Sequence, residues 1–259
     1  MTSFRHPIVP LLSLIGALFL LAGCVSTKYK MASKQTPPPV GLDRPFPAQA
    51  PLAASLRTLI IYKGPGSWKR QAYWDEYVLT LKNAGDQPLT IDSGRLIDPA
   101  GVAQDGGTDP WKLEKESKTL EQKYRDAGIA FAKNAAPLVL VTAVGYGAAA
   151  GSIMAAGGAG GAVALANAMV IALPIYYGTV LVINRHNKQA IMAEFARRRL
   201  ALPLTLAPGE SRTGSLFFPM IPEPSRLDLA VRSEGATTTS SLPLDFLKGL
   251  HVSRPEKRR

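Results

Sequence analysis

Few residues of this 259-residue chain combine a reactive type with a useful spacing. The one cysteine, Cys24, excludes intramolecular disulfides and thiolate metal clusters, because both need a second thiol. The three histidines, His6, His186 and His251, lie far apart and form no metal-ligand pattern. The chain contains no nucleophile elbow, phosphate-binding loop, HExxH motif or paired CxxC motif. We therefore expect no catalytic residue, no metal site and no cofactor, and predict that the protein is not an enzyme.

The adjacent carboxylates Asp75 and Glu76 could share a cation only if both side chains reached the same side of the chain. Neighbouring side chains of a strand point to opposite faces, so we do not expect a shared site. The tryptophans Trp68, Trp74 and Trp111 are expected in the core or at its rim, with a carbohydrate-stacking surface as the alternative.

The sequence around Cys24 has the build of an exported, lipid-modified protein. Residues 1–23 contain Arg5 and then an uncharged apolar stretch, which is typical of a secretory signal peptide. Leu21-Ala22-Gly23-Cys24 resembles the lipobox of bacterial lipoproteins at every position. In that family the cysteine thiol receives diacylglycerol, the signal peptide is cleaved before it, and the new amino group is acylated. The resemblance implies a mature chain that begins at Cys24 and carries acyl groups such as palmitate. The alternative is an ordinary signal peptide with an incidental cysteine.

The residue after the cysteine indicates a destination. It is Val25, where lipoproteins retained in the inner membrane usually have aspartate. The resemblance therefore implies sorting to the outer membrane, on its periplasmic side, with the inner membrane as the alternative. Residues 24–53 are rich in proline and show little hydrophobic periodicity, so we expect a tether between the lipid and a folded domain.

Two β-rich segments follow the expected tether, over residues 54–108 and 201–250, and residues 251–259 form a basic tail. Alternating apolar residues and turn residues predict seven strands. They are expected at 56–62, 73–81, 89–96, 202–206, 214–219, 226–232 and 242–247. Neither segment alone has enough strands for a closed sandwich, so we expect both to build one.

Short stretches of these segments are similar to the immunoglobulin-like domains of bacterial envelope proteins. Leu81-Lys82-Asn83-Ala84-Gly85 ends one expected strand, and Pro208-Gly209-Glu210 precedes another. The resemblance covers the stretches 78–89 and 206–218 and implies a fold rather than an activity.

The insertion at 109–200 contains the most unusual composition, because residues 134–184 carry no charged side chain. Such a run has to be buried in lipid or in protein. We expect a hairpin of two apolar helices, about 136–155 and 163–183, which enters a bilayer as transmembrane helices or packs in a bundle of several copies. Small residues at steps of four predict a glycine-zipper face for helix packing. They are Ala143, Gly147, Gly151 and Ala155.

Charged helices are expected on both sides of this apolar run. Asp109 followed by Pro110 is a helix start, and the pairs Glu114 with Lys118 and Glu121 with Arg125 have the favourable i,i+4 order. Residues 185–199 form an amphipathic pattern. Its expected packing residues are Ile191, Phe195 and Leu200.

The formal net charge of +11 suggests an anionic partner. Positive charge is concentrated beside the apolar run and no nucleic-acid motif accompanies it, so we expect lipid head groups and no nucleic acid. His186 is expected in solvent or near head groups. The predicted partners are membrane lipid, through acylated Cys24 and the 134–184 hairpin, and a second copy or another envelope protein.

These patterns together predict an α+β fold, an immunoglobulin-like antiparallel β-sandwich interrupted by a long glycine-rich apolar helical hairpin. The predicted function is that of a lipid-anchored bacterial cell-envelope protein with a structural or interaction role, anchoring or organising partners at the membrane. The alternative is an oligomeric membrane-inserting pore, or a secretion or transport component, built from the hairpin.

Overall fold

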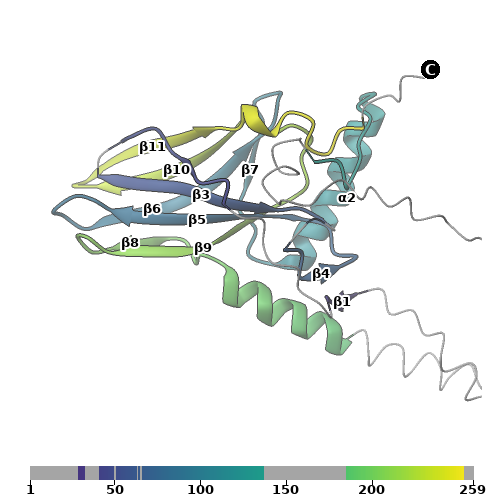
Figure 1. Cartoon of the computed structure of the whole chain (residues 1–259), viewed down its shortest axis with the longest axis horizontal. Helices are drawn as coiled ribbons and strands as arrows, with labels where there is room; N and C mark the ends of the chain where they lie inside the picture. The colour runs from purple at the N-terminus through teal and green to yellow at the C-terminus, as the bar shows by residue number, and fades with distance from the viewer. Residues whose placement is uncertain are drawn as a thin grey trace, which may run out of the picture.

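Two antiparallel β-sheets packed face to face form the body of the molecule (Figure 1). The computed structural model describes residues 29–32, 41–49, 51–62, 64, 66–136 and 185–253. One sheet has the order β2 (Arg44–Pro45), β3 (Leu52–Ile60), β5 (Asp75–Asn83) and β9 (Ser211–Phe218). The other has the order β11 (Ala236–Pro243), β10 (Arg226–Ser233), β6 (Leu89–Ile97) and β7 (Ala103–Asp105), and β8 (Leu204–Leu206) also pairs with β6.

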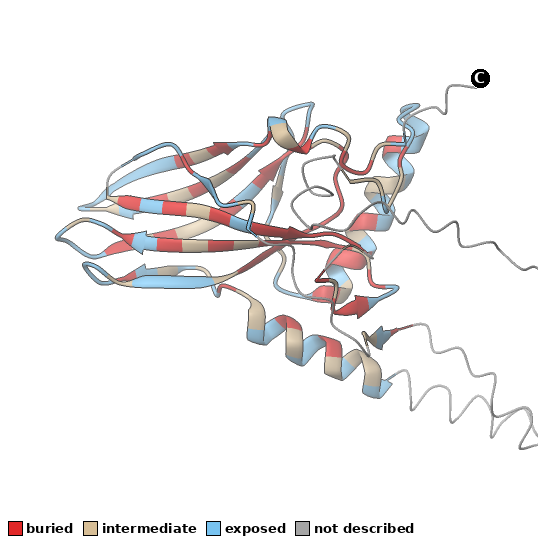
Figure 2. Cartoon of the chain, in the orientation of Figure 1, coloured by how far each residue is buried: buried red, intermediate tan, exposed pale blue. Residues whose placement is uncertain are grey.

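Apolar residues at every second position along the strands form the core between the sheets (Figure 2). On β5, Tyr77, Leu79 and Leu81 are almost fully buried, and on β10 Leu227 and Leu229 are buried in the same core. A period of two places every second side chain on the same face of a strand, so these residues cover one face of each sheet. Both sheets take strands from before and after the 109–200 insertion.

Two helices lie at one end of the sandwich (Figure 1). Helix α2 (Pro110–Asp126) begins at Asp109, whose side chain accepts hydrogen bonds from the backbone N–H groups of Trp111 and Lys112. The expected helix start is thus confirmed. A second helix spans residues 185–198, and its Ile191 and Phe195 are buried, as expected.

The expected α+β class is wrong, because β-sheets dominate the described residues and helices make up a much smaller part of them. The helices of the described residues are α2, the helix at 185–198 and the short 3₁₀ helix η1 (Asp245–Leu247). Among the described residues no helix combines the length and apolar character needed to cross a membrane, so the predicted transmembrane helix is not found either. The physical reason is that α2 and the 185–198 helix carry several charged side chains and lie on the surface of the sandwich.

Several predicted features lie outside the described residues. The hairpin arms fall almost entirely within 137–184, together with Ala143, Gly147, Gly151 and Ala155. Residues 1–28, with the predicted signal peptide and Cys24, are also outside them, so neither the signal peptide nor acylation receives support from the structure.

Parts of the proline-rich segment 24–53 are held by the domain. Strand β1 (Lys30–Met31) pairs with β4 (Lys69–Arg70), and β2 pairs with β3. The aromatic side chains of Tyr29 and Phe46 are buried. Burial of these two aromatic rings stabilises the contact between this segment and the domain.

Candidate functional site

An aromatic cluster fills the end of the sandwich where the helices pack. Phe195 of the 185–198 helix stacks on Phe217 at 4.0 Å and meets Trp74 edge-on at 5.9 Å between ring centroids. We call this the aromatic end cluster; its buried members are Tyr29, Trp68, Ala72, Trp74, Leu113, Ile191, Phe195 and Phe217. The cluster joins the N-terminal segment, both helices and the β2-β3-β5-β9 sheet into one rigid base.

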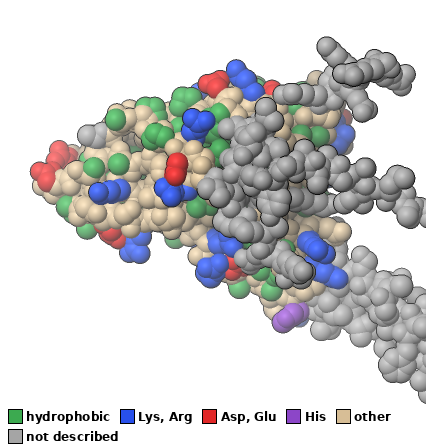
Figure 3. Space-filling view, viewed as in Figure 1, with side chains coloured by type: hydrophobic (Ala, Val, Ile, Leu, Met, Phe, Trp, Pro, Cys, Tyr) green, Lys and Arg blue, Asp and Glu red, His purple; other side chains and the backbone are tan. Residues whose placement is uncertain are grey.

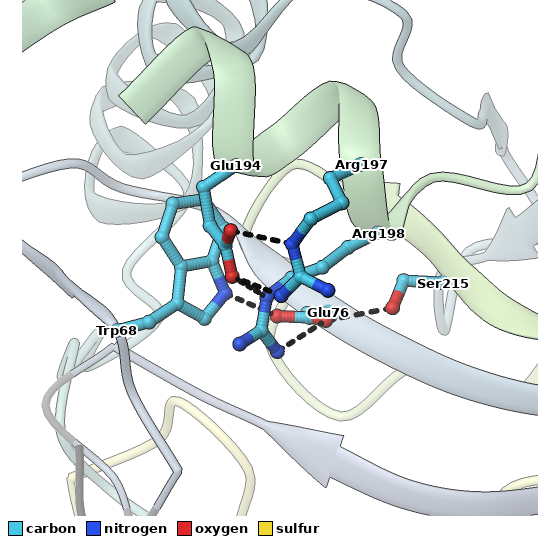
Figure 4. A network of polar contacts seen from close by, with 6 residues as sticks. All are labelled: Trp68, Glu76, Glu194, Arg197, Arg198 and Ser215. Carbon is cyan, nitrogen blue, oxygen red and sulfur yellow. Dashed lines mark hydrogen bonds and ion pairs between the residues drawn. The ribbon is translucent and has the colours of Figure 1, made fainter. Parts of the chain in front are cut away.

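Glu76 places a carboxylate inside this base with no exposed surface (Figure 4). Its Oε2 accepts a hydrogen bond of 2.6 Å from the Trp68 indole, and its Oε1 accepts one of 2.6 Å from the Ser215 hydroxyl. The Arg198 guanidinium lies 3.5 Å from Oε1. A buried carboxylate needs such partners to remain charged, and here they connect β5, β9 and the 185–198 helix.

Glu194 continues the same network towards the surface (Figure 4). It accepts hydrogen bonds of 2.6 and 2.7 Å from Arg197 and one of 2.6 Å from Arg198. The hydrogen bond from Arg197, followed by that from Arg198, lowers the pKa of Glu194 to about 2. Arg198 therefore bridges two carboxylates and fixes the last turn of the helix to the sheet.

Lys69 is the most unusual titratable group of the site, because its side chain is only 2% exposed. Its Nζ has no hydrogen-bond partner within the described part of the chain and lies 4.9 Å from the ring centroid of Trp74 and 6.0 Å from that of Trp68. Burial lowers the pKa of Lys69 to about 8, although the charges of Glu76 and Asp75 act in the opposite direction. An amine with this pKa is a potential nucleophile, but its burial closes it to a substrate.

Asp75 points to the other face of β5 and binds His251. The Asp75 Oδ2 atom lies 2.7 Å from Nε2 of His251, and both side chains are essentially unexposed. In hydrolases a carboxylate orients a histidine towards a nucleophile in this manner. Here the ring stacks on Phe131 at 5.8 Å and its Nδ1 has no hydrogen-bond partner among the described residues. The pair therefore ties the C-terminal segment to β5 without forming a triad.

Tyr29 fastens the N-terminal segment to helix α2. Its hydroxyl donates a 2.8 Å hydrogen bond to Oε1 of Glu114, which also forms an ion pair with Lys118. Burial, with the hydrogen bond to Glu114, raises the pKa of Tyr29. The Tyr29 ring contacts Trp111 edge-on at 4.9 Å.

The clearest hollow of the described surface is polar and lies at the start of α2. Its volume is about 240 Å³, and its lining includes Asp105, Asp109, Lys112 and Glu116. These side chains already have partners: Asp105 pairs with Arg95, Lys112 pairs with Glu116, and Asp109 caps the helix. These four charged groups of the hollow are therefore already engaged within the described part of the chain.

The structure separates the residues that sequence reasoning singled out. Asp75 and Glu76 make contacts on opposite sides of β5, as expected. Trp68 and Trp74 are fully buried in the core and Trp111 is half-buried at its rim, as expected. His186 is exposed, whereas His251, inside the expected tail, is fully buried.

Sequence reasoning missed the hydrogen bonds of Glu76 and His251 and the burial of Lys69. The partners of Glu76 and Asp75 lie up to 139 and 176 residues away, so local spacing carries no signal for them. Within the described ranges, no group of three or more His, Cys, Asp or Glu could hold a metal ion.

Comparison with known proteins identifies no family for this chain. No family model, no curated protein and no solved structure matches it. The immunoglobulin-like resemblance of the stretches 78–89 and 206–218 is thus without a structural relative, and function has to be inferred from sequence and geometry.

Proposed function

We propose that this protein is a lipid-anchored protein of the bacterial cell envelope with a structural or interaction role. Acylated Cys24 holds it on the periplasmic side of the outer membrane, where it anchors or organises a partner. That partner is a second copy or another envelope protein. The lipobox sequence Leu21-Ala22-Gly23-Cys24 supports the anchor.

The position of Tyr29 is the observation that carries this proposal. Tyr29 is buried and bound to Glu114, and it follows Cys24 by five residues (29 − 24). At about 3.5 Å per residue, a fully extended link of that length spans roughly 17 Å. An acyl group on Cys24 would thus hold this end of the sandwich next to the lipid surface.

The polar groups of the base favour a structural role over catalysis. Glu76, Asp75 and Glu114 are buried and paired with groups of this same chain. Such pairs position elements of the fold and leave no carboxylate directed at a substrate. A pore built from 134–184 is not proposed, because its helices would lie outside the described residues.

Metabolic labelling with radioactive palmitate in a Gram-negative host tests the anchor. We expect label in the wild-type chain and none in Cys24→Ser, and we expect the wild type to fractionate with the outer membrane on a density gradient. The matched variant Val25→Asp should keep the label and move to the inner membrane. A wild-type chain without label, or a labelled Cys24→Ser chain, would overturn the proposal.

A further inference from the structure

Five cations at one end of the molecule lack a carboxylate partner among the described residues. Elsewhere on the sandwich, arginines such as Arg57, Arg95 and Arg232 pair with aspartates. The five are exposed or half-exposed, and we call them the basic end patch: Lys30, Arg70, Lys115, Arg185 and Lys188.

Contacts of Lys188, the pairing of β1 with β4 and the spacing along the two helices place these five residues at the same end of the molecule. The Lys188 Nζ lies 5.3 Å from the ring centroid of Tyr29 and 4.9 Å from that of Trp111. Lys30 follows Tyr29 and pairs in register with Arg70 across β1 and β4. Lys115 stands one helical turn after Trp111 in α2, and Arg185 stands one turn before Lys188. Figure 3 shows blue side chains at the end of the molecule where the 185–198 helix begins.

The basic end patch brings like charges to one end of the molecule, which a bound anion would offset. Like charges opposite one another on neighbouring strands destabilise a sheet, and Lys30 faces Arg70 in this manner. Trp111, half-buried beneath Lys188, has the amphipathic side chain that is enriched where protein meets the head-group layer. Clustered lysine and arginine with an interfacial tryptophan is the composition that anionic lipid surfaces attract.

We infer that the basic end patch binds the phosphate head groups of anionic phospholipids. This inference rests on the proposed function for its orientation, because Cys24 precedes Tyr29 by five residues and Lys188 of the patch lies against the Tyr29 ring. The lipid anchor and the patch would then contact the same membrane, and the sandwich would extend away from it. A nucleic acid would satisfy the charge but not the position beside the anchor.

Flotation with vesicles tests the inference on a chain without acyl groups. The mature full-length chain carrying Cys24→Ser is mixed with phosphatidylcholine vesicles or with vesicles of equal parts phosphatidylcholine and phosphatidylglycerol. We expect tighter binding to the anionic vesicles, and expect that raising the salt concentration removes the difference, since salt screens exposed charges. The neutral vesicles account for any binding by apolar segments.

Two matched double variants, made in the same Cys24→Ser chain, locate the binding surface. Each cation near an anionic surface contributes a factor of about five, so Lys115→Gln with Arg185→Gln should weaken binding to anionic vesicles about 25-fold. Lys82→Gln with Lys123→Gln removes two exposed cations outside the patch, which also lack a described carboxylate partner. This control should change binding by less than about twofold.

Equal losses in both double variants, or equal binding to neutral and anionic vesicles, would overturn the inference. Binding of a DNA duplex as tightly as the anionic vesicles would also overturn it, in favour of a general polyanion surface. Because the tested chain is not acylated, failure of palmitate labelling leaves this result unaffected, and the two proposals fail separately.

Discussion

Glu76 is a buried residue of the base whose carboxylate binds groups from three segments of the chain. We expect Glu76→Ala to lower the free energy of unfolding by about 3–5 kcal/mol, since it strips a buried network of its acceptor. Glu76→Gln keeps the shape but presents one donor to other donors, and should cost about 1–3 kcal/mol. Urea unfolding followed by tryptophan fluorescence measures both.

Glu116→Gln is the matched control, because this glutamate is 43% exposed and its pairing distance to Lys112 is 3.8 Å. It should change stability by less than about 0.5 kcal/mol. If Glu76→Gln had the same free energy of unfolding as the control, the hydrogen bonds of Glu76 would not stabilise the fold.

The lowered pKa of Lys69 predicts that the free energy of unfolding changes with pH in a defined direction. Its pKa is about 8 in the folded chain and 10.5 when unperturbed, so between these values the unfolded chain binds the proton that the folded chain has released. Stability therefore rises with pH over this window, by at most about 1.4 kcal/mol per pH unit. Urea unfolding at pH 8 and 9.5 should show the rise in wild type, and Lys69→Met should abolish it. The same rise in Lys69→Met would contradict the assignment.

At this scale sequence reasoning separated Asp75 from Glu76 correctly and placed Trp68 and Trp74 in the core. Sequence reasoning could not find the partners of Glu76 and Asp75, because Ser215 and His251 come from distant segments that only the folded sandwich brings to β5. Likewise, nothing in the local pattern Trp68-Lys69-Arg70 distinguishes a buried lysine from an exposed one.

Among the elements, the segment around Tyr29 would link the domain to the anchor proposed at Cys24. Tyr29→Ala removes the buried ring, a loss of about 3 kcal/mol or more from local packing, and should expose Lys30 to trypsin about a hundredfold faster. Tyr29→Phe loses only the hydrogen bond to Glu114 and should accelerate cleavage about fivefold. Mass spectrometry of the timed digest measures both rates. Equal rates in wild type and Tyr29→Ala would show that the segment is not held.

Elements with strong alternation could be predicted, and those without it could not. The expected strands at 73–81, 89–96 and 226–232 correspond closely to β5, β6 and β10. Strand β11 was expected only from residue 242, because its first residues, Ala236 to Ser241, are almost all polar and mostly exposed. Strands β1 and β2 lie among prolines and were missed, since they are defined by pairing with β4 and β3 rather than by their own pattern.

The two helices followed from local signals that need no partner. Asp109 with Pro110 marks the start of α2, and Glu121 pairs with Arg125 at 3.0 Å as the i,i+4 spacing predicted. The α+β class was wrong because it gave a helical hairpin, suggested only by the composition of 134–184, equal weight with the strands, whereas β-sheets dominate the described residues.

For the molecule as a whole, the described residues form a sandwich with two different ends. One end holds the aromatic end cluster and the basic end patch, and the other holds the strand turns near Asn83 and Gly235 (Figure 1). The nine residues of β5 separate the two ends by roughly 25 Å. An anchor at Cys24 and a patch around Tyr29 would both place the first end on the membrane, leaving the strand turns free for a partner.

Energy transfer from the domain to labelled lipid head groups tests this orientation most directly. The proposed acylation would consume the thiol of Cys24, so a donor dye can be attached to one new cysteine. This is either Lys115→Cys in the basic end patch or Thr237→Cys on β11, and both positions are exposed in the wild type. With the acylated chain in phosphatidylglycerol-containing vesicles, we expect strong transfer from position 115 and much weaker transfer from position 237. Equal transfer from the two positions, or stronger transfer from 237, would contradict the claim that the basic end faces the membrane.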